Sequence, residues 1–355
     1  MRIVHVRMIT NRLPAAVIFA LCLWMSFLAG CSVNGSSDSY KSESYFIFDT
    51  IVTVKIYDAR ASDEHFDEIG RILEQIDAKM SRTSETSEIG MVNANAGIRP
   101  VAVSSETLHL VQQALDYAER TDGKFDPTVG PLVDVWGIGG ESPRRPPDDM
   151  IAEAAALTDY RLVKIDRNKS TVYLEREGMA LDLGAIAKGY AADRIAEYLR
   201  SQKLHSAIID LGGNILATGY KPDGSEWTIG VQNPDESRGT IIGTLKAHDQ
   251  SIVSSGVYER YFIEDGVRYH HILDTENGYP VRNGLTSVTI VAGSSTDADA
   301  LSTSVFSLGP EEGYAFVESL DGVEAIFITE DRKVRITSGL TGNFTLTDET
   351  FVMIE

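Results

Sequence analysis

Cysteine is scarce in this chain of 355 residues, which contains only Cys22 and Cys31. A framework of disulfides is therefore excluded as the main source of stability. The roughly 300 residues from 45 to 345 are long enough to bury an ordinary hydrophobic core. We expect them to form one domain.

Basic residues are also scarce relative to acidic ones. The chain has 32 Lys and Arg against 52 Asp and Glu, a formal net charge of −20. This balance argues against a nucleic-acid partner, because phosphate backbones require compensating Lys and Arg. An anionic ligand would need local help from a cation, a lysine or backbone N–H groups.

Long hydrophobic runs are missing too. Residues 13–28 are apolar but too short and too early for a convincing membrane span, and three arginines precede them. The run leads into Leu28-Ala29-Gly30-Cys31, which has the form of a lipoprotein cleavage box. We predict a signal peptide over 1–30, lipidation of Cys31, a flexible polar tether over 31–44, and anchoring at the extracytoplasmic face of a bacterial cell membrane. An uncleaved N-terminal anchor would look similar.

The spacing of apolar residues predicts an α+β fold. Helical periodicity indicates helices over 64–82 and 105–120. Strands are expected at 51–57, 207–210, 228–232, 241–245, 258–263, 287–292 and 324–329. Asp265-Gly266 is typical of a hairpin turn, so we expect largely antiparallel sheets flanked by helices.

The stretch from Leu181 to Asp193, LDLGAIAKGYAAD, is the most informative in the chain. An apolar strand-like run changes there into an amphipathic helix, with a lysine, Lys188, in its first turn. Free backbone N–H groups and the positive end of the helix dipole would lie near 185–188 and could bind a phosphate. The alternative is a strand–turn–helix corner whose glycines only permit tight packing.

A second polar segment, 294–303, opens another expected helix. Asp299 and Thr303 are four residues apart and would lie on one helix face, where a carboxylate and a hydroxyl can reach the same hard cation. Oxygen ligands favour magnesium over zinc. Alternatively, Thr296, Asp297 and Asp299 only cap the helix and match the charge of its N-terminus.

These segments belong to a series of blocks that resembles one known family, the ApbE-type FAD:protein FMN transferases. The further blocks are Thr121–Leu132 with Trp136-Gly137, Asp210–Asn214, Ser254–Gly256 and His270–Pro280. The resemblance implies an ApbE-like, T-fold-related domain with two lobes. It also implies an enzyme that uses Mg²⁺ to cleave the pyrophosphate of FAD, attaches FMN to a Ser or Thr hydroxyl of a partner protein, and releases AMP.

The resemblance also implies roles for individual residues. Asp182 and Lys188 match positions that contact FAD, and the carbonyl of Ala185 matches a metal ligand beside Asp299 and Thr303. The flavin-nucleotide pocket is matched by Phe48, Lys124, Phe125, Asp126 and Ile272.

A proton acceptor for the attacking hydroxyl is expected in the histidine pair. An unperturbed imidazole titrates near neutral pH, and His271 is the candidate base. His270 is the competing assignment, and both could instead serve packing or hydrogen bonding.

The chain departs from the family pattern at two places. Phe48-Asp49-Thr50 stands where the family has Met-Gly-Thr, and a family aromatic is absent from the region 80–83. An FAD pyrophosphatase, or a flavin-binding lipoprotein that modifies no partner, is therefore the alternative function. A substrate-binding lipoprotein of a transporter is a weaker one. The chain lacks an Asp-Gly-x-x-Ser/Thr-x-Thr segment, so it is not an evident acceptor itself.

Overall fold

The computed structural model describes residues 40–140 and 142–354. The expected signal peptide, Cys31 and most of the expected tether lie outside these residues. The end of that tether, however, belongs to the fold, because β1 (Lys41–Ile47) pairs along its whole length with β2 (Thr50–Ile56). The polar residues at the start of β1 are stable in a strand because β2 provides hydrogen-bond partners for their backbone N–H and C=O groups.

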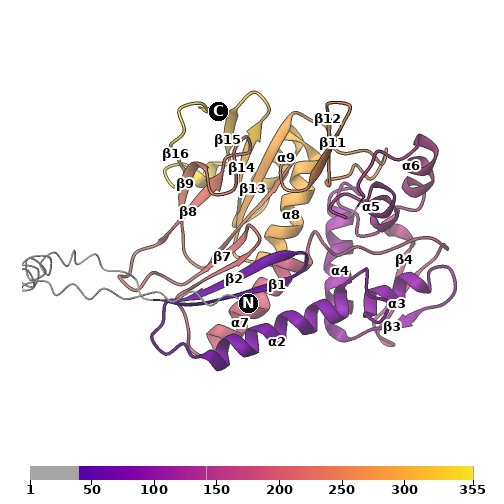
Figure 1. Cartoon of the computed structure of the whole chain (residues 1–355), viewed down its shortest axis with the longest axis horizontal. Coiled ribbons are helices and arrows are strands. Elements are labelled where there is room, and N and C mark those ends of the chain that lie inside the picture. Colours follow the sequence, from indigo (N-terminus) through magenta and orange to yellow (C-terminus); the bar gives the residue numbers. More distant parts are fainter. Residues whose placement is uncertain (1–39, 141, 355) are drawn as a thin grey trace, which may run out of the picture. The chain divides into compact units, whose positions relative to one another are not determined.

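A nine-stranded sheet forms the centre of the described structure (Figure 1). The neighbouring strands are antiparallel except for β15 and β17, which are parallel. In spatial order the strands are β1, β2, β6 (Ala207–Leu211), β7 (Asn214–Thr218), β10 (Gln250–Gly256), β13 (Leu285–Ala292), β14 (Val323–Thr329), β15 (Lys333–Ile336) and β17 (Val352–Met353).

Helices cover one face of this sheet. Their apolar stripes pack with the inward residues of the strands into one large core, which includes Ile69, Ile195 and Phe306. The covering helices are α2 (Asp63–Met80), α7 (Ala187–Ser201), α8 (Ser295–Leu308) and α9 (Pro310–Glu318). The contact between α7 and α8 is the most extensive helix–helix contact of the described residues.

A smaller sheet covers the opposite face. Its three strands are β8 (Trp227–Gln232), β9 (Ile241–Ala247) and β16 (Thr345–Leu346). Trp227, Ile229 and Leu245 from this small sheet pack with Ile252 and Ile326 of the large one in a second core. The alternation of buried and exposed residues along β8 follows from this one-sided packing.

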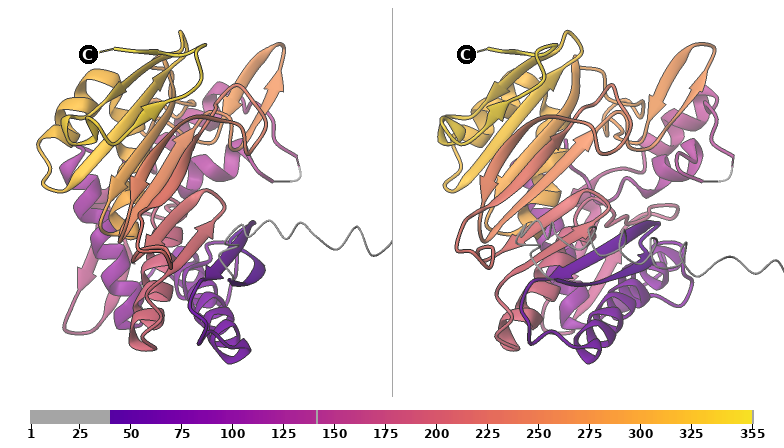
Figure 2. Two further views of the ribbon diagram at one scale, coloured as in Figure 1. Left: turned by 90° about the vertical axis from the view of Figure 1, so that its left-hand side faces the viewer. Right: turned by 60° about the vertical axis from the view of Figure 1, so that its left-hand side comes forward.

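Between β2 and β6 the chain leaves the large sheet and forms a segment of mostly short elements, shown in magenta tones in Figure 2. After α2, these elements are α3 (Glu88–Ala94), β3 (Val101–Ala102), α4 (Ser105–Arg120), α5 (Gly130–Trp136), α6 (Asp148–Ala155), η1 (Tyr160–Leu162), β4 (Val163–Asp166) and β5 (Thr171–Leu174). A hairpin of β11 (Tyr261–Glu264) and β12 (Val267–His270) places Phe262 and Tyr269 against Trp136. The last short element is η2 (Ser338–Leu340).

The α+β class with mostly antiparallel sheets is confirmed. The helix expected at 105–120 matches α4, and Asp265-Gly266 joins β11 to β12 as predicted. The strand expected at 258–263 begins only at Tyr261, because residues 257–260 form a turn. Among the described residues, no helix combines the length and apolar character needed to cross a membrane.

Candidate active site

A cavity of about 710 Å³ lies where the large sheet meets the segment inserted between β2 and β6. Its walls come from the β1–β2 turn, the loops around α5, the start of α7, the β6–β7 turn, β10 and α8. Every site residue that the sequence analysis proposed within the described part lines it: Phe48, Lys124, Phe125, Asp126, Asp182, Ala185, Lys188, His271, Ile272, Asp299 and Thr303. The fold thus brings together residues that are far apart in the sequence.

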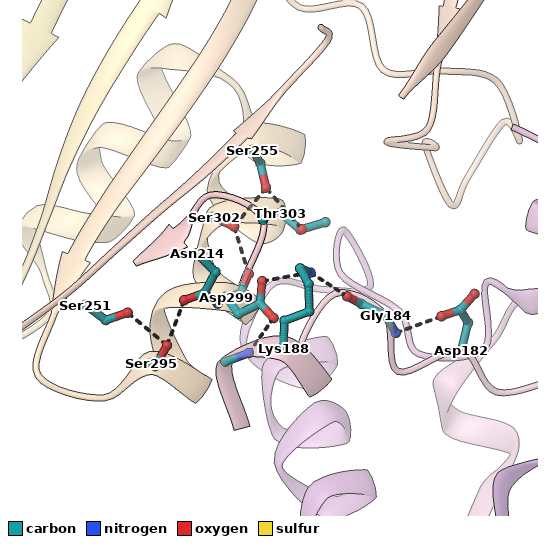
Figure 3. Close-up of polar contacts among 12 residues, drawn as sticks. Asp182, Gly184, Lys188, Asn214, Ser251, Ser255, Ser295, Asp299, Ser302 and Thr303 are labelled. Carbon is teal, nitrogen blue, oxygen red and sulfur yellow. Dashed lines mark hydrogen bonds and ion pairs between the residues drawn. The ribbon is translucent and has the colours of Figure 1, made fainter. Parts of the chain in front are cut away.

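The start of α7 is shaped by a local turn. The Asp182 carboxylate accepts a hydrogen bond from Gly184 N at 2.7 Å, so the chain turns sharply before the helix. Lys188, in the first turn, points back and donates to the carbonyl of Gly184 at 3.0 Å. Its ammonium also lies 3.4 Å from Oδ1 of Asp299 (Figure 3).

Helices α7 and α8 complete each other's N-termini. Asp193 of α7 accepts from the backbone N–H groups of Ser295 and Thr296 at 2.9 and 2.8 Å, and Asp299 of α8 accepts from Gly189 N at 2.9 Å. This exchange requires close approach, since a Cβ on Gly189 would lie 2.1 Å from the carbonyl oxygen of Ser295. The capping alternative is thus partly right, but Asp299 caps the neighbouring helix, whereas Ser294 caps α8 itself.

The residues present fit a hard cation better than a soft one. Asp299 is 3% exposed, and its Oδ1 faces the Lys188 ammonium, which lies between this oxygen and the Gly184 carbonyl. A positive charge is therefore already held by oxygen atoms there. The described residues contain no cluster of three or more His, Cys, Asp or Glu that could hold a metal. A cation at Asp299 would therefore depend on neutral oxygens and on oxygens of a ligand.

Thr303 stands one turn after Asp299 on α8. Its hydroxyl is 3.4 Å from Ser255 Oγ, and Ser255 is 2.8 Å from Ser302 Oγ (Figure 3). Ser302 in turn donates to the backbone carbonyl of Asp299 at 2.8 Å. This hydroxyl series holds the expected Thr303 ligand on the same wall as Asp299.

Asn214 lines the cavity and has one buried side-chain donor without a partner. Its side-chain oxygen accepts from Ser295 Oγ at 2.9 Å, and Ser251 Oγ donates to Ser295 Oγ at 2.9 Å. The Asn214 Nδ2 group has no partner in the described structure, although the residue is 3% exposed and lines the cavity. Leaving such a group unpaired costs about 1–3 kcal/mol, so the site favours a ligand that accepts hydrogen bonds.

Apolar side chains also line the cavity. Phe48, Phe125 and Ile272 line it, and Phe125 packs edge-on against Tyr117 with ring centroids 6.2 Å apart. Phe48 has φ +55° and Asp49 has φ +55°, so both central residues of the β1–β2 turn are left-handed. Non-glycine residues rarely adopt this conformation, and it fits a type I′ hairpin.

Asp126 and Lys124, two of the proposed flavin-pocket residues, differ in whether their charged groups are free for a ligand. Both oxygens of the Asp126 carboxylate are already used, by Thr128 N and Oγ1 and by Tyr160 N at 2.9 Å. Burial raises the pKa of this carboxyl. Asp126 therefore shapes its loop, whereas the Lys124 ammonium lies at the cavity, 3.5 Å from Glu276.

The two histidines differ in environment. His270 is 4% exposed, its Nε2 donates to the Val281 carbonyl at 2.9 Å, and its ring packs edge-on against Phe306. His271 lines the cavity, with Nδ1 3.3 Å from the Arg260 carbonyl. If Nδ1 carries the proton, Nε2 is left as the acceptor.

Their pKa values shift in the same direction. Burial lowers the pKa of His270 to about 4. Burial, followed by the nearby charges of His270, Arg260 and Lys188, lowers the pKa of His271 to about 3. Both imidazoles are therefore neutral near pH 7.

Several charged residues of the cavity were not identified from the sequence. Arg82 lies 3.3 Å from Asp182 and contacts Asp134 at 2.5 Å, and Arg238 donates to the Gly212 carbonyl at 2.8 Å and pairs with Glu259 at 3.3 Å. These contacts join segments that are distant in sequence, and no local pattern predicts them. Asn214 was visible only as the last residue of a glycine-containing block.

This architecture defines a class of site. Its lining offers ammonium, amide and helix N-terminal groups to an anion together with aromatic and aliphatic side chains, so the cavity suits a ligand that carries both phosphate and an apolar part. Residues 48–327 match the model of the ApbE family, and the chain belongs to this family.

Curated relatives and solved structures of the same family are also similar to this chain. The FAD:protein FMN transferase of Treponema pallidum is 38% identical over 328 residues, covering 88% of this chain and 91% of that protein. The one of Klebsiella pneumoniae is 40% identical over 269 residues, 76% and 83% of the two chains. The structure of the ApbE protein of Thermotoga maritima aligns with a TM-score of 0.79 and 34% sequence identity, and the alignment covers 86% of this chain and 99% of that one. The structure of the flavin transferase ApbE of Vibrio cholerae aligns with a TM-score of 0.77 and 30% sequence identity, and the alignment covers 86% of this chain and 100% of that one.

Proposed function

We propose that this protein transfers FMN from FAD to a Ser or Thr hydroxyl of a partner protein, with magnesium bound and AMP released. Its family membership and its relatives make it an FAD:protein FMN transferase. The metal, the hydroxyl acceptor and the released nucleotide are the finer parts of the proposal. They are supported by the chemistry of the cavity.

The observation that carries the proposal is the oxygen-held ammonium of Lys188 beside Asp299 at the start of α7. A pyrophosphate placed there would meet the Lys188 charge and the unpaired Nδ2 of Asn214. Magnesium, held by Asp299, Thr303 and the Ala185 carbonyl, would supply neutralisation of the pyrophosphate charge. The isoalloxazine ring would then extend toward Phe48, Phe125 and Ile272.

His271 is the proposed base. The acceptor oxygen forms a bond to the phosphorus of the FMN moiety, the bond from that phosphorus to the bridging oxygen breaks, and AMP carries this oxygen away. The hydroxyl proton passes to Nε2 of His271, while the Arg260 carbonyl holds Nδ1. His270 suits this role poorly, because its Nε2 is bonded to Val281 and its ring packs on Phe306.

The test compares His271→Ala with His270→Ala on an acceptor domain that carries an Asp-Gly-x-x-Ser/Thr-x-Thr segment. His271→Ala should still bind FAD, as measured by flavin fluorescence quenching. Its labelling of the acceptor, followed by in-gel flavin fluorescence, should fall by about 10²–10⁴. Near-normal labelling by this variant would remove His271 from the mechanism. Release of AMP by the parental protein without any labelling would favour the hydrolytic alternative.

We also propose that the protein is a lipoprotein anchored through Cys31 at the extracytoplasmic face of the membrane. The support is the sequence of the N-terminal region, with its basic start, apolar run and cleavage box. Removing residues 1–30 takes away three arginines and no acid, which would change the net charge from −20 to −23.

A further inference from the structure

The β1–β2 hairpin carries an exposed apolar pair next to the cavity. Phe46 and Ile51 are direct cross-strand partners, and they are 81% and 62% exposed. We call these two residues the hairpin patch. Tyr45 has the opposite orientation, since its hydroxyl donates to the Phe66 carbonyl on α2 at 2.7 Å. The patch is therefore on the face that α2 does not cover.

The patch is continuous with the cavity wall. Only Ile47 and Thr50 separate its two residues from the turn, and Phe48, Asp49 and Thr50 all line the cavity. The turn is fixed, since Arg260 donates to the Asp49 carbonyl at 3.4 Å and Thr50 packs against the Gly212 turn. In Figure 2 the hairpin, in indigo, lies at the surface of the described part.

We propose that the hairpin patch is the docking surface for the acceptor protein. This inference rests on the transfer function, which requires a protein hydroxyl to enter a cavity that already holds FAD. An exposed apolar pair beside the cavity offers contact area to a protein that enters it, and the aromatic side chain contributes a large part of this area. The partner is an acceptor that places an apolar side chain against Phe46 and Ile51.

The geometry also suggests the shape of the docked segment. Among the described strands, β1 pairs only with β2 and so ends the large sheet on this side. An extended chain can add to such an edge, with main-chain hydrogen bonds for affinity and side-chain contacts for specificity. Phe46 is two residues from Phe48 of the cavity wall, and at roughly 3.3 Å per residue a strand beside β1 covers this span in about two residues. The acceptor's apolar residue should thus lie within about four residues of its hydroxyl.

The test uses the full-length protein with the double change Phe46→Ser and Ile51→Ser, and the acceptor domain described above. The KM for the acceptor should rise at least about tenfold, as for other aromatic anchors, while the maximal labelling rate is kept. The affinity for FAD should not change. The matched control is Ile98→Ser, at a residue that is 70% exposed and does not line the cavity, and it should behave like the parent.

A photo-crosslinking amino acid at position 46 supplies a second measurement, and it should capture the acceptor in one specific product. An unchanged KM together with no crosslink would overturn the proposal. So would an equal loss of FAD affinity, which would assign the patch to the flavin site. Lost binding to phosphatidylethanolamine–phosphatidylglycerol vesicles with a normal KM would identify a membrane contact instead, and a dimer converted to a monomer would identify a second copy of this chain.

Failure of the two ideas can be told apart. If the parental protein binds FAD but labels no acceptor, the transfer function fails and the docking surface fails with it. If parent and double variant label equally well at limiting acceptor, only the docking surface is refuted.

Discussion

Replacing Asp299 by Asn removes one charge and keeps the size of the side chain. The Asn oxygen can still accept from Gly189 N, which Asp299 Oδ2 does now at 2.9 Å. The change therefore leaves the cap of α7 in place but takes away the only carboxylate among the proposed metal ligands. Losing one partner of a buried charge contact costs about 3 kcal/mol or more, so the apparent affinity for magnesium should fall by roughly 10²-fold.

Asp299→Ala separates the structural role of this residue from its role toward the cation. The fold itself depends on this side chain, because Ala would leave the buried Gly189 N–H without an acceptor. We expect Asp299→Ala to lose about 1–3 kcal/mol of unfolding free energy, and Asp299→Asn much less.

Chemical denaturation measures the stability difference, and AMP release from FAD at increasing magnesium concentration measures the metal dependence. Asp297→Asn is the matched control on the same helix, since Asp297 bonds to the Tyr117 hydroxyl at 2.7 Å and does not line the cavity. Its magnesium dependence should equal that of the parent. The reasoning is refuted if Asp299→Asn turns over FAD with the parental magnesium dependence.

Three further predictions follow from the same structure and sequence. The pKa of His270 is lowered to about 4 in the fold, below the unfolded value near 6.5, so protonation favours the unfolded chain. The free energy of unfolding, measured by urea denaturation, should fall as the pH drops from about 6.5 toward 4, and it should fall less steeply in His270→Gln. The same dependence of this free energy on pH in the two proteins would contradict the prediction. Asn214→Asp replaces a donor by a carboxylate and should weaken FAD binding about tenfold or more in fluorescence titrations, whereas unchanged affinity would exclude contact with the pyrophosphate. Cys31→Ser should move the protein from the membrane to the soluble fraction, since a lipid contributes roughly 0.8 kcal/mol per buried CH₂, and equal retention would support an uncleaved anchor.

The sequence predicted the local parts of the site well. The helix that contains Lys188 and the helix after Ser294 depend on neighbouring residues, through periodicity and capping. The strand expected before the first of them is wrong, because residues 181–183 form no strand and only an isolated bridge at Ala180 precedes the turn. The helix expected at 64–82 corresponds to α2, Asp63–Met80. These features are encoded within a few turns of the chain.

The parts that were missed depend on residues far apart in the sequence. The Asp193 and Asp299 exchange between α7 and α8 requires the packing of two helices, and Arg82 meets Asp182 only after the inserted segment folds back. The short elements α3, α5 and α6 have too few residues to show a clear period. The first four residues of β1, 41–44, were assigned to the tether because they are polar, but they pair with β2 like the rest of the strand.

The pairing of β2 with β6 has a consequence for how the protein forms. Val52 is opposite Leu211, so the N-terminal hairpin cannot complete its sheet until the whole segment 57–206 has been synthesised. Contacts of such long sequence separation slow folding, because the entropy of loop closure is lost before the contacts are gained. Part of the cavity wall comes from this intervening segment and the rest from the sheet, its turns and α8, so the cavity is assembled late. A partly made chain should therefore be unable to hold FAD, and flavin binding can serve as a reporter of the final folding step.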